Sequence, residues 1–527
     1  MNSLPLASLE GAPAPTGTPG NLTEVLIRAA ADAPGPTLHF VRPDGAETTL
    51  SYTDLLDRAS RVAGGLRAAG ARPGERLLVA AGCGRDLVIG VWAGILAGLP
   101  VLPADLSARP DLDVLRATAA PDWVLTGGPG DDIPVAETGS ERLAGSVLGL
   151  ELGAPDTRWY EAQPGDPALL TLTAGTSGDP KAVVLTHGAI TARSAATIAD
   201  NDLGPRTVTV NWMPLDHVGG LVMFHLRDVQ AGAVQVHADR GMVLNDPLRL
   251  LDLISRHRAA ITWATTSALE LIAGRAEETS RGWDLSCLTY VMNGGEPVRA
   301  RAVRRFTKAL GRFGMPPTAV RPGWGMSEIA GGVVDHRIDA RVLAPDARWT
   351  PVGRPHPGVG VRVVDDSGTV LTEGVVGRLQ IRTTADVRYA DGRRPVTATG
   401  WVETGDLAFI ESGLLTVTGS AADAIVMDGV LHHAHELEST VGQLPFVDPA
   451  HTVAALTTAA DGNPELVIAY RPATDQPEDE AAERIRSVIA ARHGLEVGRV
   501  VPVAAGRLPR TRTGKPQRAR LAALLAP

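Results

Sequence analysis

The chain has 527 residues, more than a single hydrophobic core normally supports, so we expect two or three domains. Its formal net charge of −9 argues against a protein that coats nucleic acid, and its 44% hydrophobic and 21% charged residues are typical of a soluble globular protein. Because the only cysteines are Cys83 and Cys287, no disulfide framework is indicated, and we expect a reducing, cytoplasmic location.

The N-terminal segment 1–20 is rich in Pro, Gly and Ala and lacks the basic start of a signal peptide, so we predict a disordered leader. Helical periodicity begins at Leu22, and after a strand-like segment a second amphipathic helix is expected over 52–69. The longest apolar stretch, 87–102, contains several glycines and Pro100. We interpret it as a buried helix and strand and expect no membrane partner.

Apolar, β-rich segments alternate with helical ones to about residue 310, which predicts an α/β fold with layered, largely parallel sheets. After Pro351 the short strands with Gly and Asp turns indicate a β-rich subdomain. Strands over 451–458 and 465–472 and a helix over 478–493 then indicate a compact α+β unit. We predict a large N-terminal domain over 21–419 and a small, mobile C-terminal lid domain over 420–527.

The sharpest local signal is the segment LTLTAGTSGDPKAVVLTH, residues 170–187. Glycines allow a backbone to approach a polyphosphate closely, and successive amides and hydroxyls can donate to its oxygens. The segment does not match the Walker A pattern, and a Gly/Ser/Thr cluster alone would be interpreted as a surface turn. It ends, however, at Lys181. Lys181, Lys308 and Lys515 are the only lysines among 50 basic residues, so we favour a phosphate site.

Further motifs follow along nearly the whole chain: NWMPLDHVGG (211–220), NGGEPVRARAVRRF (293–306), RPGWGMSE (321–328), TGDL (404–407), TGSAADAIVMDG (418–429) and LPRTRTGKPQRARL (508–521). In this order they resemble the acyl-adenylate-forming superfamily, which contains acyl-CoA synthetases, peptide-synthetase adenylation domains and fatty acyl-AMP ligases. The sequences of the NGGEPVR and RPGWGMSE motifs are most similar to those of fatty acyl-AMP ligases.

The resemblance implies ATP and Mg²⁺ as cofactors and a set of nucleotide-binding residues. These are Thr173, Gly175, Thr176, Ser177, Gly178, Lys181, Gly294, Gly295, Glu296, Pro297, Trp324, Gly325, Met326, Ser327 and Asp406. The ring of Trp324 would stack on adenine, where the family usually has tyrosine, and Asp406 would accept the ribose hydroxyls. Glu328 and Thr176 would bind Mg²⁺. Outside these motifs, Trp324 would be interpreted as a core residue, Glu328 as a solvated acid and Asp406 as part of a turn.

Lys515 resembles the family lysine that bridges carboxylate and phosphate oxygens as pyrophosphate leaves, so it is our main catalytic candidate. Residues 499–520 around it include seven basic residues and no acidic one. Such a stretch could be a solvated basic face or a nucleic-acid patch. ATP binding and docking of an acidic carrier protein explain the same charge without nucleic acid as a partner.

We expect three segments, beginning after residues 211, 263 and 292, to line the acid pocket. Its residues are Asp216, His217, Val218, Gly219, Met223, Thr265 and Asn293. His217 resembles a family histidine beside the substrate carboxylate and is a catalytic candidate with Glu328, although a lone histidine is often structural. Asp216 could select a substrate amine or hydroxyl, or it could cap a turn. His432, His433 and His435 match no closed zinc set, and we interpret them as loop residues.

Four positions depart from the family pattern: Glu403, Ser420, Ala422 and Val426. Three of them lie at or beyond the predicted hinge. We therefore expect adenylation to be retained, whereas the domain rotation that serves thiol transfer lacks its usual hinge residues. The implied activity is ATP-dependent conversion of a carboxylic acid to acyl-AMP and pyrophosphate, then acyl transfer to the phosphopantetheine thiol of an acyl carrier protein or CoA, in specialised metabolism.

The sequence leaves two alternatives open, a ligase that uses a non-thiol nucleophile and a degenerate nucleotide-binding scaffold. We expect a carrier protein acting in trans, because no carrier domain follows the Lys515 motif. The identity of the acid is not encoded in any motif.

Overall fold

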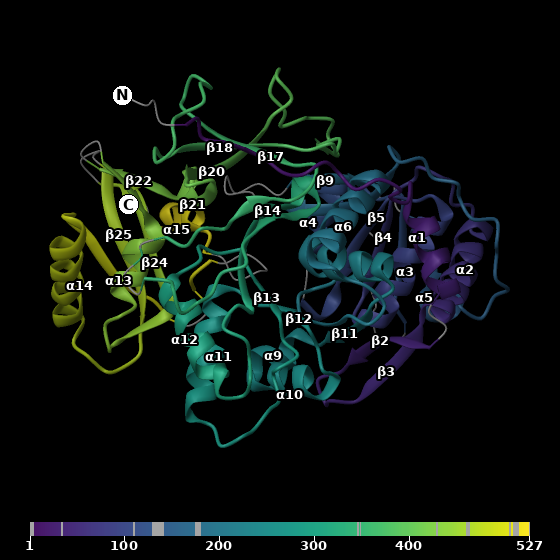
Figure 1. Ribbon diagram of the computed structural model, residues 1–527, viewed down its shortest axis with the longest axis horizontal. Helices are drawn as coiled ribbons and strands as arrows, with labels where there is room; N and C mark the ends of the chain where they lie inside the picture. Colours follow the sequence, from purple (N-terminus) through teal and green to yellow (C-terminus); the bar gives the residue numbers. More distant parts are fainter. Residues whose placement is uncertain are drawn as a thin grey trace.

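The computed structural model describes residues 5–32, 35–108, 111–128, 142–173, 181–344, 347, 349–427, 430–459, 464–504, 507–509 and 516–525. Helices and sheets alternate in layers over the larger part of the molecule, which confirms the predicted α/β class (Figure 1). No helix within the described ranges is long and apolar enough to span a bilayer.

The largest sheet has nine strands, and its central strands run parallel. In spatial order they are β16 (Arg354–Pro355), β15 (Gly331–Asp335), β14 (Val320–Met326), β13 (Tyr290–Asn293), β12 (Ile261–Trp263), β10 (Val208–Asn211), β11 (Val234–Ala238), β2 (Pro36–Val41) and β3 (Glu47–Ser51). The strands from β14 to β2 are parallel to their neighbours. Apolar side chains of α10 (Leu248–His257), α11 (Thr266–Glu278) and α12 (Ala300–Gly311) form one hydrophobic cluster with this sheet.

A seven-stranded sheet forms the second layer. Its order is β19 (Arg388–Tyr389), β9 (Lys181–Thr186), β8 (Pro167–Thr173), β5 (Val101–Asp105), β4 (Leu77–Ala81), β6 (Trp123–Thr126) and β7 (Arg142–Ser146). The helices around it are α1 (Leu22–Asp32), α2 (Tyr52–Ala68), α3 (Gly84–Ala97), α4 (Leu112–Ala119), α5 (Val147–Leu150) and α6 (His187–Asn201).

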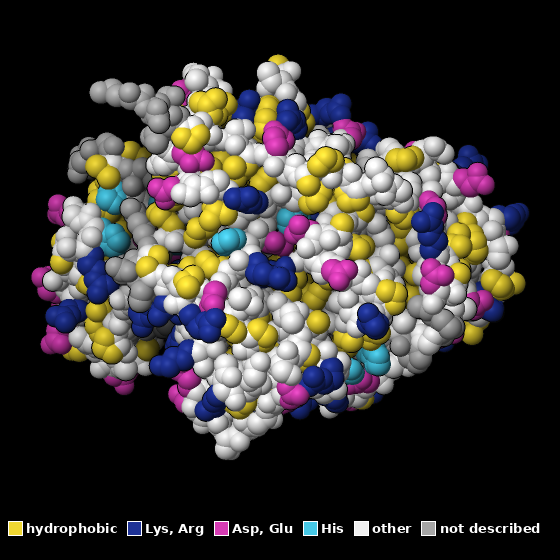
Figure 2. Space-filling view, viewed as in Figure 1, with side chains coloured by type: hydrophobic (Ala, Val, Ile, Leu, Met, Phe, Trp, Pro, Cys, Tyr) yellow, Lys and Arg dark blue, Asp and Glu magenta, His cyan; other side chains and the backbone are white. Residues whose placement is uncertain are grey.

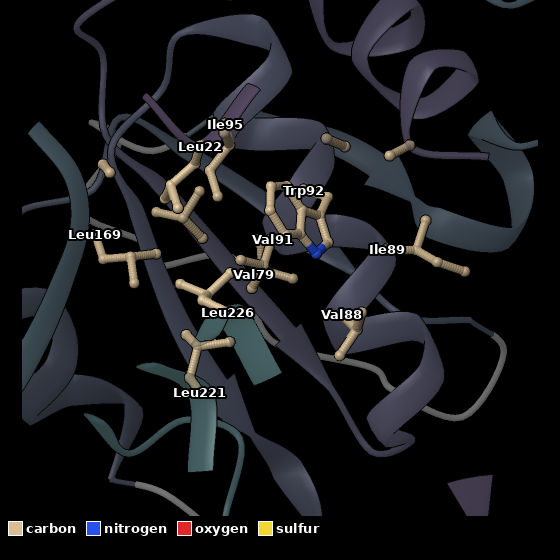
Figure 3. Packing of buried hydrophobic residues seen from close by; sticks show 14 of the residues in the cluster. Leu22, Val79, Val88, Ile89, Val91, Trp92, Ile95, Leu169, Leu221 and Leu226 are labelled. Atoms are coloured by element: carbon tan, nitrogen blue, oxygen red, sulfur yellow. The ribbon is translucent and has the colours of Figure 1, made fainter. Parts of the chain in front are cut away.

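The core of this layer is built around α3, which is buried along nearly its whole length. Trp92 lies among aliphatic side chains such as Val79, Val91 and Ile95 (Figure 3). Its indole N–H donates to Nε2 of His225 at 2.8 Å, so the one polar atom of the ring is satisfied. The apolar stretch 87–102 is thus divided between a helix and a strand, as predicted.

The β-rich subdomain is a five-stranded antiparallel sheet, and it corrects our prediction for the N-terminal segment. Its order is β1 (Ser8–Glu10), β17 (Gly360–Val364), β18 (Gly377–Arg382), β20 (Val402–Glu411) and β21 (Leu414–Ser420). Ser8 pairs with Arg362, and Ala7 is fully buried. The prediction of a disordered leader is therefore wrong for the described part of 1–20, because a long-range strand pairing orders a segment whose composition favours disorder.

The elements after η4 (Ala421–Asp423) have a hydrophobic cluster of their own. They are β22 (Ala424–Met427), β23 (Val430–His433), α13 (Ala434–Val441), β24 (Val447–Thr458), β25 (Pro464–Pro472), α14 (Glu478–His493), β26 (Arg499–Pro502) and α15 (Arg518–Leu525). The predicted helix 478–493 coincides with α14. His432 and His433 belong to β23 and His435 to α13, so interpreting them as loop residues was wrong. A domain boundary near 420 stays a prediction.

Short elements connect these layers. They are η1 (Leu106–Ala108), α7 (Val218–Gly220), the π-helical turn η2 (Leu221–Leu226), α8 (Arg227–Ala231), α9 (Arg240–Asn245) and η3 (Ser327–Ile329). Trp349 contacts the C-terminal unit, because its ring lies 5.3 Å from that of His433 and 5.8 Å from that of His435, between ring centroids.

Candidate active site

The predicted acid-pocket and NGGEP residues gather at one edge of the nine-stranded sheet, whereas Thr173 and Lys181 belong to the seven-stranded sheet and Asp406 to the β-rich sheet. The parallel strands β10, β12, β13 and β14 all end at that edge of the nine-stranded sheet, and the motif residues from 212 to 217, 264 to 265 and 293 to 295 directly follow three of these ends. Open α/β sheets bind ligands at the carboxyl ends of their strands. Three distant motifs therefore converge where the fold is able to hold a ligand.

Glycines make this edge unusually tight. A Cβ atom on Gly294 would lie 2.9 Å from the carbonyl oxygen of Gly323, and one on Gly325 would lie 2.1 Å from that of Gly331. Both separations are too short for any side chain, so β13, β14 and β15 approach at these points only because the residues are glycines. Gly295 has φ +79°, a backbone conformation that also favours glycine.

The ends of the predicted phosphate loop are held in a hairpin. Strands β8 and β9 pair antiparallel, and Thr173 lies opposite Lys181 at the point where the loop leaves the sheet. Gly175, Thr176, Ser177 and Gly178 lie outside the described residues. Thr173 and Lys181 are thus the two predicted phosphate-binding residues that the structure places.

Glu328 and Lys181 meet at a tyrosine that the sequence analysis missed. The hydroxyl of Tyr389 donates to Oε1 of Glu328 at 3.1 Å, and Nζ of Lys181 lies 5.4 Å from the centroid of the Tyr389 ring. Burial, together with the charge of Glu328, raises the pKa of Tyr389, so its hydroxyl stays protonated at neutral pH. One tyrosine thus bonds to a hard carboxylate through its hydroxyl and has a lysine over its ring.

Tyr389 is brought to Lys181 by strand pairing. The two-residue strand β19 pairs with β9, and Tyr389 lies opposite Val183. No motif marks this position, and a pairing between strands some 200 residues apart has no local sequence signal. The scarcity of tyrosine, with five in the whole chain, was the available hint.

Trp324 and Asp406, predicted to contact adenine and ribose, are joined by a hydrogen bond. The indole N–H of Trp324 donates to Oδ2 of Asp406 at 2.8 Å. Thr404 Oγ1 accepts the backbone N–H of Asp406 at 3.1 Å and so fixes the turn that carries the carboxylate. The bond aligns the ring edge with the acid, and it couples β14 to the β-rich subdomain.

Several predicted pocket residues have structural partners. Nδ1 of His217 accepts the backbone N–H of Gly219 at 3.0 Å and caps α7. Oδ2 of Asp216 accepts the backbone N–H of Asp105 at 3.1 Å, which supports the structural interpretation of that carboxylate. Thr265 caps α11 by accepting the N–H of Ala268 at 3.1 Å.

Asn293 and Met223 also connect elements around the pocket. The side-chain amide of Asn293, which is fully buried, donates to the carbonyl of Ala264 at 2.9 Å. The backbone N–H of Gly332 lies 3.1 Å from Sδ of Met223, so this methionine packs directly against the strand that follows η3. Val218 and Gly219 are buried beside them.

The NGGEP segment is anchored to the start of α11. Oε2 of Glu296 accepts the backbone N–H of Ser267 at 3.0 Å and its hydroxyl at 2.9 Å, and the carbonyl of Pro297 accepts the hydroxyl of Thr266 at 3.0 Å. The Glu296 carboxylate therefore positions the segment. Ser327 and Met326 lie half-buried at the junction of β14 and η3.

Apolar side chains form a largely buried cluster beside the predicted acid pocket. A cluster of hydrophobic side chains lines the face of β12 and β13 next to η2: Met213, Met223, Phe224, Ile261, Trp263, Tyr290 and Met292. The rings of Trp212 and Trp263 lie 5.3 Å apart, and the indole N–H of Trp212 donates to the carbonyl of Trp263 at 2.7 Å.

Lys515 lies outside the described residues, but part of the basic stretch around it is described. Arg518 pairs with Glu438 and Asp423 at 2.8 Å, and Arg499 pairs with Glu465 at 2.7 Å. These arginines balance acids from elsewhere in the C-terminal unit, so the stretch is less free for docking than its composition indicated. Figure 2 shows other Lys and Arg side chains gathered over α12 and the adjoining C-terminal unit.

The tight strand ends at Gly294 and Gly325 and the hairpin that ends at Lys181 lie in the motifs that resemble the adenylate-forming superfamily. The family described as AMP-binding enzyme matches residues 27–387, and the chain belongs to this family. The resemblance seen in the motifs is thereby confirmed.

Relatives include synthetases of specialised metabolism. The chain is 30% identical over 553 residues to the nonribosomal peptide synthetase apvA of Aspergillus terreus (strain NIH 2624 / FGSC A1156), covering 96% of this chain and 58% of that protein. The chain thus spans little more than half of this curated relative.

Solved adenylation domains share the fold. The McyG A-PCP structure complexed with phenylalanyl-adenylate has a TM-score of 0.90 and 28% identity, over 98% of this chain and 84% of that one. The adenylation, ketoreductase and pseudo Asub structure of a keto acid-selecting NRPS module also has a TM-score of 0.90, with 30% identity over 100% of this chain and 47% of that one.

Proposed function

We propose that the protein activates a carboxylic acid with ATP and Mg²⁺, forming acyl-AMP and pyrophosphate, and then passes the acyl group to the phosphopantetheine thiol of a carrier protein or CoA. The contact of Glu328 and Lys181 with Tyr389, next to the hairpin at the strand ends, is the observation that carries this proposal. The fold brings these groups together beside the strand ends, and this placement supports nucleotide binding there.

The residues present fit a magnesium ion. Glu328 supplies a hard carboxylate oxygen, held in place by the Tyr389 hydroxyl, and Thr176 would add a hydroxyl. Mg²⁺ would neutralise phosphate charge as the substrate carboxylate attacks the α-phosphorus. Lys181 would contact the phosphates from the end of the loop, and Trp324 with Asp406 would bind the nucleoside.

The remaining chemistry is assigned to a lid. We propose that residues 420–527 form a domain that closes over the site and brings Lys515 to the carboxylate and phosphate oxygens. Closure would exclude water from the mixed anhydride, which hydrolyses readily. His217 caps a turn beside the pocket, and its ring would then orient the carboxylate.

For the substrate, we propose an apolar or aromatic acid that carries no protonated amine. The apolar cluster beside the predicted pocket supports the first part. The second part is supported by the description of a structural neighbour that is 30% identical to this chain, a keto acid-selecting NRPS module. The named synthetase relatives and the A-PCP neighbour support a carrier protein as acceptor.

The experiment is acid-dependent pyrophosphate exchange with a panel of keto, aryl, fatty and amino acids. Lys515→Ala should lower the exchange rate by about 10²–10³-fold, because it removes a charge that stabilises the transition state. Lys308→Ala, a lysine in the last turn of α12, is the matched control and should retain wild-type rates. Full activity in Lys515→Ala would contradict its role.

A nucleotide-binding scaffold is the second candidate, because Ser420 and Ala422 depart from the family pattern at the predicted hinge. Oγ of Ser420 here donates to the carbonyl of Gly405 at 3.4 Å. If none of the acids on the panel supports pyrophosphate exchange, this scaffold is favoured. If exchange is observed, mass spectrometry of carrier or CoA products separates thiol transfer from a ligase that uses another nucleophile.

A further inference from the structure

Two histidines and a glutamate come together on a part of the nine-stranded sheet that adenylation does not use. They are His39 on β2, Glu47 at the start of β3 and His257 at the end of α10. One ligand atom from each lies within 4.8 Å of those from the other two. Two imidazoles and one carboxylate form a ligand set that suits Zn²⁺.

Strand pairing explains why these side chains face one another. In the β2–β3 hairpin His39 lies opposite Thr49, and Val41 lies opposite Glu47. Residues that are opposite, or two apart along a strand, share a face of the sheet, so His39 and Glu47 point the same way. Val41 packs in the same cluster as the apolar residues of α10, which places His257 over this face.

The distance between His39 and Oε2 of Glu47 fits a tetrahedral ion, and His257, whose ligand atom lies within 4.8 Å of the other two, would have to move closer. Nδ1 of His39 lies 3.5 Å from Oε2 of Glu47, and Nε2 of His257 lies 3.2 Å from Oε1. Around Zn²⁺ with bonds of about 2.0–2.1 Å, neighbouring ligand atoms lie roughly 3.3–3.4 Å apart. Arg256 also contacts Glu47, with Nη2 2.6 Å from Oε1, so an ion would use Oε2, the oxygen that faces His39.

A buried nitrogen also points to a ligand here. Within the described part of the chain, Nδ1 of His39 is shielded from solvent and makes no hydrogen bond. The carboxylate oxygen paired with this nitrogen, Oε2 of Glu47, lies 3.5 Å away, too far for a normal hydrogen bond, so the nitrogen is poorly satisfied. An ion at this position would satisfy it, and because all three residues are partly exposed, the ion could enter from solvent.

A second group, Asp200, Asp335 and His356, shares the shielded imidazole nitrogen but offers one imidazole and two carboxylates, a ligand set less typical of Zn²⁺. Asp335 already accepts the hydroxyl of Tyr290 at 2.7 Å and lies 3.2 Å from the imidazole of His356. Nη1 of Arg193 lies 3.1 Å from Nδ1 of the same histidine, so both nitrogens of this ring already have a polar neighbour. We do not assign a metal to this group.

We propose that His39, Glu47 and His257 bind one Zn²⁺, with a water as the fourth ligand, and that the ion ties the β2–β3 hairpin to the end of α10. His257 lies where the chain turns toward the amino end of β12, across the sheet from the nucleotide edge. The ion therefore stabilises the sheet and takes no part in adenylation. This inference does not depend on the proposed function.

The test uses the full chain after removal of metals with a chelator. Calorimetric titration should show one Zn²⁺ per chain, Co²⁺ should give the visible absorption of a four-coordinate site, and Zn²⁺ should raise the Tm. His257→Ala and Glu47→Gln should each weaken Zn²⁺ affinity by roughly 100-fold or more, since losing even an indirect partner of a metal ligand costs 10–100-fold.

His451→Ala is the matched control, because Nδ1 of His451 lies 2.9 Å from Oδ2 of Asp448 in a histidine–carboxylate pair outside both three-residue groups. It should retain wild-type affinity. Circular dichroism establishes that each variant is folded, and Glu47→Gln keeps the side-chain volume. The proposal is overturned if the wild type binds no Zn²⁺ at micromolar concentration, or if His257→Ala and Glu47→Gln bind as tightly as His451→Ala does.

Discussion

Arg518 should hold the base of the lysine-bearing loop to the rest of the C-terminal unit. It lies three residues after Lys515, at the start of α15. Its guanidinium donates from Nε and Nη2 to the two oxygens of Glu438 at 2.9 and 2.8 Å and from Nη1 to Asp423 at 2.8 Å. Arg518 and Glu438 are 13% and 12% exposed in their side chains, so Arg518→Ala would leave a nearly buried carboxylate without its partner.

The size of the effect follows from this burial. Removing one partner of a buried ion pair costs about 3–5 kcal/mol. Because Asp423 is 31% exposed and regains water, we expect the lower end, about 3 kcal/mol. At 1.4 kcal/mol per factor of ten, local opening of the unit should become roughly 100- to 200-fold more frequent.

Hydrogen exchange followed by mass spectrometry measures this opening directly. Amides of β24 are the best reporters, because Ala454 N–H donates to Oε1 of the same Glu438 at 2.9 Å. Arg520→Ala, an exposed arginine on the same helix, is the control. If exchange in Arg518→Ala stays within twofold of that in Arg520→Ala, the assigned role of the ion pair is wrong. Arg518→Lys should fall between them, since lysine cannot bind a carboxylate in the same forked geometry.

Three further predictions concern the site and its support. Tyr389→Phe removes the hydrogen bond to Glu328 and should lower kcat about tenfold and raise the Mg²⁺ concentration needed for half-maximal pyrophosphate exchange; unchanged values contradict the contact's role. Trp324→Phe keeps a flat ring but loses the bond to Asp406, so the KM for ATP should rise about tenfold with little change in kcat, whereas a pure loss of kcat would argue against nucleoside binding. Burial raises the pKa of Asp335. This effect is outweighed by the hydrogen bond and charge of His356 and by the hydrogen bond from Tyr290, so the resulting pKa is about 2. Its contribution to stability is thus present above about pH 4 and lost as the pH falls toward 2, and Asp335→Asn should reduce the dependence of the unfolding free energy on pH in that window.

Local patterns were sufficient for much of the fold. The helix over 478–493 and the alternation of strands and helices up to residue 310 follow from hydrophobic periodicity within short windows, and the structure confirms both. In these cases the information lies within a few residues of the feature that it predicts.

Contacts between distant segments account for what was missed. Tyr389 donates to Glu328 across 61 residues, and Asp216 accepts an N–H from Asp105 across 111. Tyr389 and Asp105 lie in no recognisable motif, because a single hydrogen bond does not constrain the residues next to them in the sequence. Glu296 shows the reverse case: the motif marked it for the nucleotide, while its carboxylate bonds to Ser267.

Strand β1 has a consequence for the order in which the chain folds. Ser8 pairs with Arg362, so the two partners are about 350 residues apart and β1 stays without this partner until β17 has been synthesised. Closing so long a loop is entropically costly and slow. The β-rich sheet is therefore completed late, and until then the unpaired edge of β17 is open to pairing with another chain during synthesis.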